Sequence, residues 1–377
     1  MDYKEDLLKW FGDQVTELIN GRSISRETAR NMMIETLTGS QPDLQQGAFL
    51  ASLRMKGETE DEIVGCFEAI IESDTNSVNL KDLPVMENCG TGMDSLKTFN
   101  ISTLSAIVAA CMGVPIARHG ARAISSRCGT VDLCEALGVD VECSVETVKK
   151  SIEECGLGLF NGTSAEVHPI GLGRILSQIR FGTTLNIAAS LANPALPKLA
   201  VRGVGAPEQI EPTLKVMKQI GYKKGLVFHG FNRDRSAGMD ELSTLGVSKV
   251  GFFQENRRTE YFETTPEDAG LLTGDYDEIK PDEEKGTEAL KAVYLLAGKG
   301  GKSRTDIVSL NAGAVLWMAD KVSNLKEGVE AARQIINKGD ALKKLMAWVK
   351  AQNRKPESGN SIISSLSQKD NIDIVVI

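Results

Sequence analysis

The sequence predicts an α/β protein with two parts, a small all-helical N-terminal domain and a large α/β domain built on a mainly parallel central sheet. Two observations lead to this fold class. Residues 1–72 show helical apolar spacing with few glycines, whereas from residue 85 short apolar runs alternate with helical stretches. At 377 residues, the chain can bury the sizeable core that two domains need.

The helical domain is expected over residues 1–72. Thr59 and Glu62 stand at capping-box spacing before the apolar run IVGCFEAII, which predicts that a helix begins there. The polar stretch SDTNSVNLKDLP that follows predicts a connection. Residues 165–196 return to helix-like apolar spacing, so we expect this later segment to rejoin the helical domain.

The large domain is expected over residues 85–352. Its predicted strands are PVME, VPIA, LGLF, KGLVFHG and SKVGFF, and helical segments such as VDLCEALG and VETVKKSIEECG lie among them. Residues 353–377 are expected to form a polar C-terminal tail that ends in the β-prone run IDIVVI. For that run, a disordered end and a strand added to an exposed sheet edge are both open.

The composition is typical of an intracellular globular protein. Hydrophobic residues make up 41% of the chain, and the net charge of −8 argues against nucleic acid or an anionic membrane as the partner. The seven cysteines form no CxxC pair, which favours a reducing compartment. The N-terminal MDYKEDLLKWFG lacks a signal-peptide pattern and no apolar run reaches transmembrane length, so we expect a cytoplasmic protein.

The stretch NCGTGMDSLKTFNIST at 88–103 joins a predicted strand to a predicted helix through a glycine turn. Such a junction directs backbone N–H groups and a helix N-terminus at whatever lies above it, which favours an anion. By itself, the stretch is also compatible with an ordinary strand-to-helix turn.

A second block, ARHGARAISSRCGTVDL, crowds Arg118, His119, Arg122 and Arg127 with serines and a threonine between a strand and a helix. Basic and hydroxylic side chains in one loop suit a polyphosphate, because they donate charge-assisted hydrogen bonds. Alone, this block could be a solvated loop. Its occurrence beside the glycine turn favours an anion site.

A third block, GMDELS, places Asp240 and Glu241 after the predicted strand KGLVFHG. Mg²⁺ prefers carboxylates together with water and substrate phosphates, so this pair is a candidate metal site. The three histidines, His119, His168 and His229, lack metal-ligand spacing, but all lie in turns marked by glycine or proline. We favour a functional role for His119 and leave the other two open.

In this order, GTGMDSLKTFNIST, RHGARAISSRCGTVDLCEALGV, LANPA and GMDELS resemble the motifs of anthranilate phosphoribosyltransferase. The family patterns are GTGGDG..TFNIST, KHGNRA.SS.SGSADLLEALGV, LTNPA and DGLDELS. Four separate motifs in one order with similar spacing make the resemblance specific. It covers roughly residues 15–350 and leaves only the tail outside.

The resemblance implies transfer of phosphoribosyl from phosphoribosyl pyrophosphate (PRPP) to the amine of anthranilate in tryptophan biosynthesis, with release of pyrophosphate. It also implies a small helical domain joined to a large α/β domain, a homodimer, and Mg²⁺ as the cofactor. The aromatic amine is already a nucleophile, and pyrophosphate leaves readily once its charge is neutralised. Catalysis then depends on positioning and electrostatics, and we assign no general base.

Carried over by motif position, the resemblance implies three groups of site residues. The donor site would consist of Gly90, Thr91, Gly92, Asp94, Thr98, Asn100, Ser102, Thr103, Arg118, His119, Gly120, Ser125, Ser126 and Thr130. The metal would contact Ser102, Asp240 and Glu241. The acceptor site would involve Gly90, His119, Ala121, Arg174 and Arg180.

In the donor half, the chain departs from the family pattern at two glycines. Met93 replaces the second glycine of GTGGDG, and Ser95 replaces the last. Methionine adds a Cβ and bulk where the family brings its backbone close to the donor. If residue 93 needs a positive φ, the loop must rearrange, although most hydroxyl and acid positions are kept.

The acceptor half departs further. Ala121 replaces the asparagine that follows KHG and meets anthranilate, and HPIGLGRILSQIRFGTT is shorter than the family's HPAMK…VR..LG.RT. Gly182 stands where the family has the arginine before the threonine, which leaves Arg174 or Arg180 to recognise the carboxylate. Loss of a bidentate arginine weakens discrimination for an acidic aromatic acceptor.

These departures leave alternatives to anthranilate open. One is a phosphoribosyltransferase with a different aromatic or base acceptor. Another is an enzyme like pyrimidine nucleoside phosphorylase, which shares the fold, although the Asp240–Glu241 pair and the NIST motif favour the transferase. The last is a non-catalytic relative that binds nucleic acid. Met93 and Ala121 keep that interpretation open, and the net charge of −8 counts against it.

Overall fold

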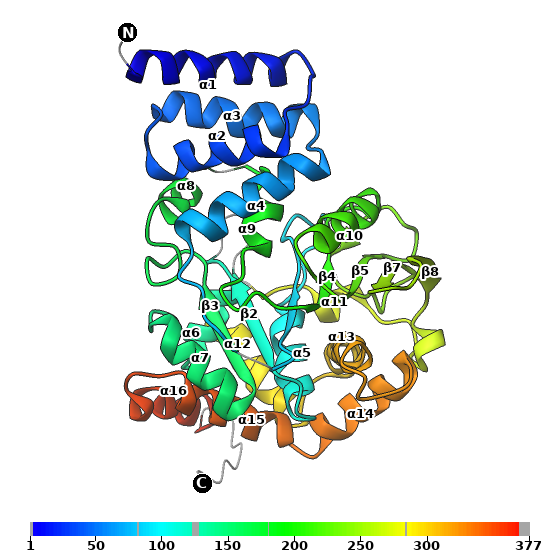
Figure 1. The fold of residues 1–377 in the computed structure, drawn as a ribbon. Coiled ribbons are helices and arrows are strands. Elements are labelled where there is room, and N and C mark those ends of the chain that lie inside the picture. The colour runs from blue at the N-terminus through cyan, green and yellow to red at the C-terminus, as the bar shows by residue number, and fades with distance from the viewer. Residues whose placement is uncertain (1–2, 81–82, 123–127, 180, 283–284, 369–377) are drawn as a thin grey trace.

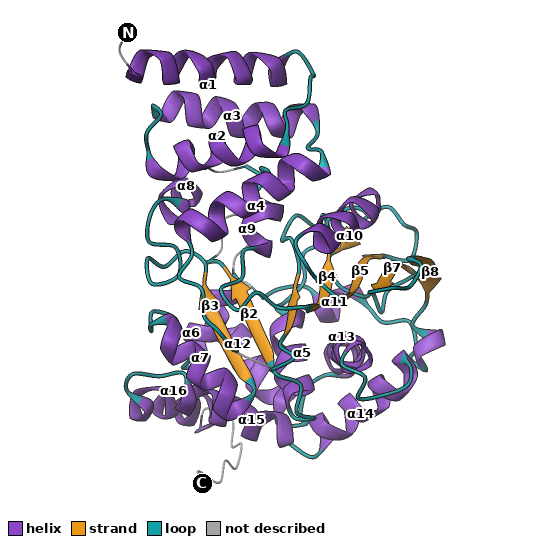
Figure 2. Ribbon diagram, in the orientation of Figure 1, coloured by secondary structure: helices purple, strands orange, loops and turns teal. Residues whose placement is uncertain are grey.

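The structure, a computed structural model, describes residues 3–80, 83–122, 128–179, 181–282 and 285–368 (Figure 1). The N-terminal helices stack at one end of the molecule, and the last described helices lie at the other. Figure 2 shows the strands gathered in the second domain with helices around them. Within the described ranges, no helix combines the length and apolar character needed to cross a membrane.

The N-terminal domain is built from helices alone. They are α1 (Tyr3–Ile19), α2 (Arg26–Thr38), α3 (Asp43–Lys56) and α4 (Glu60–Asp74). The predicted capping box at the start of α4 is present. Thr59 Oγ1 accepts from the Glu62 N–H at 3.2 Å, and the Glu62 carboxylate accepts from the Thr59 N–H at 2.8 Å. The second oxygen of Glu62 accepts from the Ile24 N–H at 3.0 Å, which ties α4 to the start of α2.

Two later helices complete the core of the N-terminal domain. They are α8 (Leu172–Gln178) and α9 (Leu185–Leu191). Leu172 and Leu185 are buried in the same hydrophobic cluster as Phe49 of α3. Asp74, at the end of α4, fixes the start of α8, because its carboxylate accepts from the N–H groups of Gly171 at 3.0 Å and Leu172 at 2.6 Å.

The second domain is built on one sheet with the strand order β3-β2-β1-β4-β5-β7-β8. Its strands are β1 (Met86–Cys89), β2 (Ile116–Gly120), β3 (Leu157–Asn161), β4 (Leu199–Gly203), β5 (Lys224–Phe231), β6 (Gly238–Met239), β7 (Ser248–Gln254) and β8 (Glu260–Thr264). Strands β1 to β5 pair in parallel, whereas β6, β7 and β8 pair antiparallel at one side. The predicted fold class is therefore confirmed.

Helices connect these strands and cover the sheet. They are α5 (Ile101–Ala110), α6 (Thr130–Ala136), α7 (Val145–Cys155), α10 (Ile210–Gln219), α11 (Tyr276–Ile279), α12 (Lys285–Leu296), α13 (Lys302–Met318), α14 (Leu325–Asn337) and α15 (Asp340–Ala351), with short 3-10 turns at Pro207–Gln209 and Glu267–Ala269. Helices α5 and α13 pack together in the main core, where Ser105 donates to the Val308 carbonyl at 3.2 Å. This packing holds α5, which follows the inner strand β1, in place against the second domain's core.

The C-terminal segment differs from the polar tail expected over 353–377. The structure describes this segment up to residue 368, and Pro356–Gln368 form a further helix, α16. Ile363 of α16 is buried in the main core, and Arg354 pairs with Asp140 at 2.6 Å. Most residues of α16 are polar, so the few apolar residues that face the core give only a weak helical pattern in the sequence. The run IDIVVI lies outside the described residues.

Candidate functional site

A cavity of about 270 Å³ lies at the carboxyl ends of the parallel strands. Strand β1 lies between β2 and β4, so the order of the strands reverses beside it, and open α/β sheets bind ligands at such a point. The predicted site residues that line the cavity are Gly90, Thr91, Gly92, Asp94, Thr98, Asn100, Ser102, Arg118, His119, Gly120, Ala121, Thr130, Asp240 and Glu241. The three sequence blocks therefore meet in one place.

The glycine turn after β1 brings the backbone against an acidic side chain. Gly92 has a φ of +68°, which side chains rarely adopt, and its N–H donates to Asp240 Oδ2 at 2.7 Å. A Cβ at Gly90 would lie 2.2 Å from the same oxygen, so position 90 has no room for a side chain. Met93 is not in the left-handed region, so the methionine does not force the loop to rearrange.

The turn leads into the N-terminus of α5. Asn100, at the N-cap, donates from its side-chain amide to the Cys128 carbonyl at 3.2 Å, and the hydroxyl of Thr91, in the turn before the helix, is buried without a partner among the described residues. The Ser102 N–H donates to Glu241 Oε1 at 3.1 Å. The partial positive charge of the helix N-terminus adds to these donors, so this corner of the cavity suits an anion.

Arg118 is a buried cation beside the turn, with 1% of its surface exposed. Its Nη2 donates to Ser102 Oγ at 2.9 Å, and its Nη1 donates to Thr103 Oγ1. Burial lowers the pKa of the guanidinium, and no described carboxylate lies within ion-pair distance of it. Because a buried charge without a counter-ion is costly, this arrangement favours an anionic ligand.

Three carboxylates, those of Asp94, Asp240 and Glu241, line the same cavity. Burial raises the pKa of Asp240 to about 7, and the charge of Asp94 adds to this effect. Burial, followed by the charge of Asp240, also raises the pKa of Glu241. Lys97 offsets part of the negative charge through its ion pair with Asp94 at 2.7 Å. Buried acids that repel one another gain from a cation placed between them.

These acids suit a divalent cation that is shared with a ligand. Among the residues that the structure describes, no three His, Cys, Asp or Glu side chains form a ready-made metal cluster. Mg²⁺ is usually bound by one or two carboxylates together with waters and substrate phosphates. Asp240, Glu241 and the Ser102 hydroxyl supply donors of that kind at the cavity wall.

His119 and His168 form a buried pair that joins the cavity wall to the end of α4. Their Nε2 atoms lie 3.1 Å apart, and His168 Nδ1 lies 2.6 Å from the Asp74 carbonyl oxygen. Because a carbonyl only accepts, we assign the proton of His168 to Nδ1, so that its Nε2 accepts from the Nε2–H of His119. Burial lowers the pKa of both rings, so both are neutral.

The neutral state of His168 predicts a pH-dependent stability. Its pKa in the folded chain lies below the ordinary value of 6.5, so the unfolded chain binds the extra proton and stability falls as the pH drops below that value. The variant His168→Gln lacks this titration. We expect the stability advantage of the wild type over the variant to shrink as the pH falls from about 7.5 to about 5.5. Thermal unfolding measures this, and a constant difference would contradict a neutral His168.

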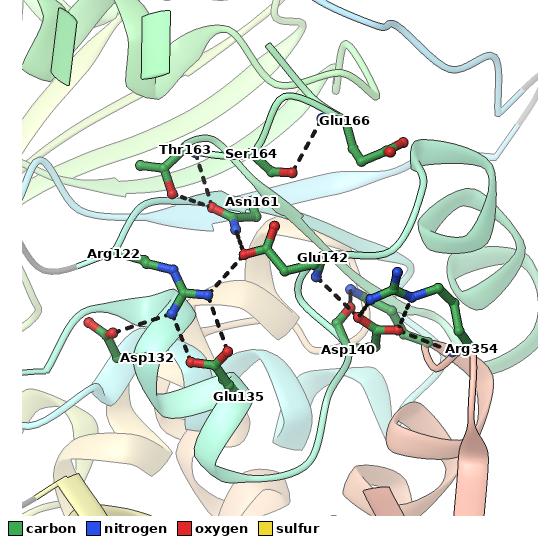
Figure 3. Close-up of polar contacts among 11 residues, drawn as sticks. Arg122, Asp132, Glu135, Asp140, Glu142, Asn161, Thr163, Ser164, Glu166 and Arg354 are labelled. Atoms are coloured by element: carbon green, nitrogen blue, oxygen red, sulfur yellow. Dashed lines mark hydrogen bonds and ion pairs between the residues drawn. The ribbon is translucent and has the colours of Figure 1, made fainter. Parts of the chain in front are cut away.

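Arg122 lines the cavity from the loop after β2 and is surrounded by acids (Figure 3). Its guanidinium pairs with Glu135 at 2.7 Å and with Glu142 at 2.9 Å, and Asp132 lies at 3.7 Å. The charge of Arg122 is therefore already neutralised. Of the two arginines at the described cavity wall, Arg118 is the one without an acidic partner.

Other predicted site residues lie elsewhere. Thr103 is buried behind the wall, where it accepts from the Arg118 guanidinium. His229 does not line the cavity, and its Nδ1 lies 2.8 Å from the Val204 carbonyl oxygen. Three further predicted residues, Ser125, Ser126 and Arg180, lie outside the described residues.

Arg174, predicted for the acceptor, does not line the cavity either. Its guanidinium donates to Gln46 Oε1 at 3.1 Å and to the Thr36 carbonyl at 2.9 Å, and it lies 3.5 Å from the Asp43 carboxylate. These partners belong to the helical domain, so the position of Arg174 does not support contact with an acceptor.

The sequence analysis missed polar residues of the cavity wall. Lys97 lies within the glycine-turn stretch, and its spacing of three residues from Asp94 was a signal for the ion pair. Asn186 and Ser190 reach the cavity from α9. They belong to no motif, although their spacing of four residues places them on one face of a helix.

Two family descriptions match the chain. Residues 82–342 match "Glycosyl transferase family, a/b domain", and residues 14–74 match "Glycosyl transferase family, helical bundle domain". The two matches cover the α/β domain and the helical domain in the order in which the chain contains them.

Curated relatives match almost end to end. An anthranilate phosphoribosyltransferase from Methanothermobacter marburgensis is 34% identical over 87% of this chain and 95% of its own length. One from Myxococcus xanthus is 36% identical over 88% of this chain and 96% of its own length.

Solved structures show the same arrangement. The crystal structure of anthranilate phosphoribosyltransferase from Thermus thermophilus is 33% identical, with a TM-score of 0.80 over 90% of this chain and 98% of that one. The enzyme from Saccharomyces cerevisiae, in complex with PRPP and Mg, has a TM-score of 0.77 over 94% of this chain and 98% of that one. At 20% identity, this second likeness shows the fold alone.

Proposed function

The chain belongs to the anthranilate phosphoribosyltransferase family, and we propose that it transfers phosphoribosyl from PRPP to the amine of anthranilate, in tryptophan biosynthesis. One observation carries the proposal. The glycine turn, the N-terminus of α5, the buried Arg118 and the Asp240–Glu241 pair all meet in a single cavity. The hydrogen-bond donors and the arginine suit a polyphosphate, and the two carboxylates suit a divalent cation. The cavity therefore offers both kinds of group in one place.

The pyrophosphate end of the donor is expected at the glycine turn. The Thr91 hydroxyl, which has no partner in the part of the chain that the structure describes, and the start of α5 offer hydrogen-bond donors, and Arg118 supplies the charge behind them. Arg118 acts partly through Ser102, whose hydroxyl accepts from the guanidinium. A fixed cation and oriented donors stabilise the negative charge that develops on pyrophosphate as the glycosidic bond breaks.

We propose Mg²⁺ as the cofactor, held by Asp240, Glu241 and Ser102 together with donor oxygens. When bound, Mg²⁺ neutralises pyrophosphate charge and makes it a better leaving group. The acids themselves support this assignment, because burial raises the pKa values of both, the charge of Asp94 raises that of Asp240 further, and the charge of Asp240 raises that of Glu241 further. The backbone N–H of Gly92 holds Asp240 in place.

The acceptor is expected against the helical side of the cavity. Leu172 and Leu176 of α8 and Leu185 and Ala189 of α9 give that wall an apolar surface that suits an aromatic ring. We propose that His119 helps to position the acceptor in the cavity, because His168 fixes the orientation of the His119 ring.

The reaction requires little proton chemistry from the chain. The amine nitrogen forms a bond to the anomeric carbon of the ribose while the bond from that carbon to pyrophosphate breaks, and the nitrogen then loses a proton to solvent. The chain orients the two substrates and stabilises the departing charge, and both effects lower the barrier. A carboxylate on anthranilate requires its own cation, for which Arg180 stays the predicted residue.

The proposal is tested by calorimetry followed by turnover. PRPP is titrated into the protein with Mg²⁺, and anthranilate is then added to the saturated complex while its fluorescence is followed. We expect Mg²⁺-dependent binding of PRPP and loss of anthranilate. Binding without loss of anthranilate would replace the acceptor by another amine or base, and absence of binding would overturn the proposal. Phosphate-dependent release of a base from a pyrimidine nucleoside would show a phosphorylase instead.

We further propose that the protein is a cytoplasmic homodimer. Exposed apolar side chains of the helical domain support the dimer, because Leu44 and Met55 of α3 are 88% and 86% exposed. Light scattering is expected to give the mass of two chains for the wild type and of one chain for Leu44→Glu. Leu272→Glu, at an exposed leucine of the other domain, is the control and should stay dimeric. A single-chain mass for the wild type would contradict the dimer.

A further inference from the structure

A buried ion pair lies behind the cavity wall and takes no part in the site described above. It joins Arg202 of β4 to Glu87 of β1 at 3.2 Å, and both side chains are fully buried. Neither of these two residues lines the cavity. Burying two charges costs free energy that their attraction only partly returns, and apolar side chains of similar size are often as stable. Stability alone therefore does not account for the pair.

The carboxylate of Glu87 is held by two further donors. Tyr222 donates its hydroxyl to one carboxylate oxygen at 2.9 Å, and Asn193 donates its side-chain amide to the other at 3.0 Å. Asn193 is the asparagine of the LANPA motif, and the same amide also donates to the Ala117 carbonyl of β2 at 2.9 Å. Glu87 therefore has a fixed position in the sheet, and it fixes the guanidinium of Arg202 in turn.

Arg202 also binds Ser190, near the end of α9, through both of its terminal nitrogens. Its Nη1 donates to Ser190 Oγ at 2.9 Å, and its Nη2 donates to the Ser190 carbonyl at 3.0 Å. The last carbonyls of a helix have no partner within the helix, and a cation beside them also suits the helix dipole. Helix α9 has only 7 residues, so contacts with the rest of the chain must hold it in place. Arg202 supplies such a contact.

One face of α9 forms the helical wall of the cavity. The residues of α9 that line the cavity are Leu185, Asn186, Ala189 and Ser190. Figure 1 shows α9 at the junction between the helical domain and the sheet. At the other end of the ion pair, Glu87 belongs to β1, which leads directly into the glycine turn. The pair therefore links the α9 wall to the strand that carries the donor turn.

We propose that Arg202 is a positioning residue for the transfer reaction. By bridging Glu87 and Ser190, it holds the α9 wall at a fixed place relative to the glycine turn, so that two substrates in the cavity meet in a productive geometry. The inference rests on the proposed function, because it concerns the same cavity and the same reaction. Orientation of two reactants lowers the barrier between them, and a displacement of about 1 Å can cost about 100-fold in rate.

A set of variants separates positioning from stability. Arg202→Met leaves Glu87 charged and without its arginine, so it should lower the melting temperature by about 5 °C or more. The double variant Arg202→Met, Glu87→Gln removes both charges and should regain most of that loss. Because Ser190 stays unbridged in the double variant, its kcat should still lie about 30-fold or more below the wild type, with the KM for PRPP within about threefold.

Two further variants complete the set. Arg202→Lys keeps a charge beside Glu87 and a donor for Ser190, so kcat should return to within about fivefold of the wild type. Lys56→Met is the matched control, because it breaks another buried ion pair, with Glu62 at 2.8 Å, at a residue that does not line the cavity. This control should melt at a lower temperature than the wild type and keep its kcat.

Hydrogen exchange followed by mass spectrometry reports how firmly α9 is held, without any turnover. The amides of α9 should exchange about tenfold faster or more in the double variant than in the wild type, whereas those of the sheet should exchange at wild-type rates. Lys56→Met should leave the exchange of α9 unchanged.

A double variant with the kcat of the wild type would overturn the proposal. So would a kcat that falls and recovers in step with the melting temperature across all variants, because Arg202 would then act on stability alone. If the wild type does not transfer phosphoribosyl to anthranilate, the proposed function fails and hydrogen exchange decides the positioning role. Faster exchange confined to α9 supports that role, and unchanged or uniformly faster exchange overturns it.

Discussion

Replacing Gly90 by alanine is expected to lower kcat/KM for PRPP by about 100-fold or more. The added Cβ would lie 2.2 Å from Asp240 Oδ2 and 2.5 Å from its carboxyl carbon. Asp240 must then leave its place, and its bond from the Gly92 N–H at 2.7 Å is lost. One methyl group thereby disturbs both the anion-binding turn and the proposed metal ligand.

The matched control for Gly90→Ala is Gly47→Ala, at a glycine of α3 with open space around its Cβ position. This control should keep full activity. Circular dichroism should show that both variants are folded. A titration of activity with Mg²⁺ should show that Gly90→Ala needs a higher Mg²⁺ concentration than the wild type, and that Gly47→Ala does not. Activity of Gly90→Ala equal to that of the wild type would contradict the role given to Asp240.

Replacing Arg118 by methionine is expected to weaken PRPP binding by roughly 100-fold without unfolding the chain. The guanidinium is buried, donates to Ser102 and Thr103, and has no acidic partner among the described residues. Its removal takes away the charge that an anion meets. It also takes away the cost of burying that charge, so the melting temperature should not fall. The two effects therefore separate binding from stability.

Arg118→Lys is the rescue variant, because the family pattern has lysine at this position. It should recover PRPP binding to within about tenfold of the wild type, since it keeps the charge but loses the fork of donors. Calorimetry and thermal unfolding measure both variants. A methionine variant that binds PRPP as the wild type does would show that Arg118 has only a structural role.

The local patterns of the donor site could be predicted from the sequence, because each lies within one short stretch. The strand, glycine turn and helix of residues 88–103 appear as expected. The contact between Gly92 and Asp240 could not be derived in this way. It depends on how β6 pairs with β5, which brings together residues that are far apart in the chain.

The charges of the second block show the opposite case. The sequence suggested that Arg118 and Arg122 would both face a phosphate, and the structure separates them. Arg122 is neutralised by Glu135 and Glu142, whereas Arg118 is buried and forms no ion pair with an acid among the described residues. Which acids pair with a basic residue depends on tertiary contacts. The basic residues of one loop therefore do not show by themselves which of them stay available for a phosphate.

The C-terminal helix was missed for a similar reason. Helix α16 presents mostly polar residues, and one deeply buried side chain, Ile363, anchors it in the core. Arg354 and Asp140 secure the start of this segment. A short apolar stripe in a polar segment gives a weak periodic signal, so its packing partners decide whether it folds.

Simultaneous measurement of pyrophosphate release and anthranilate loss tests the central claim most directly. The purified protein receives PRPP, Mg²⁺ and anthranilate, and both quantities are followed over time. The proposed phosphoribosyl transfer predicts that they change in equal amounts, that omission of anthranilate stops pyrophosphate release, and that Gly90→Ala slows both by about 100-fold or more. Pyrophosphate release that is independent of anthranilate, or no release at all, would contradict an anthranilate phosphoribosyltransferase.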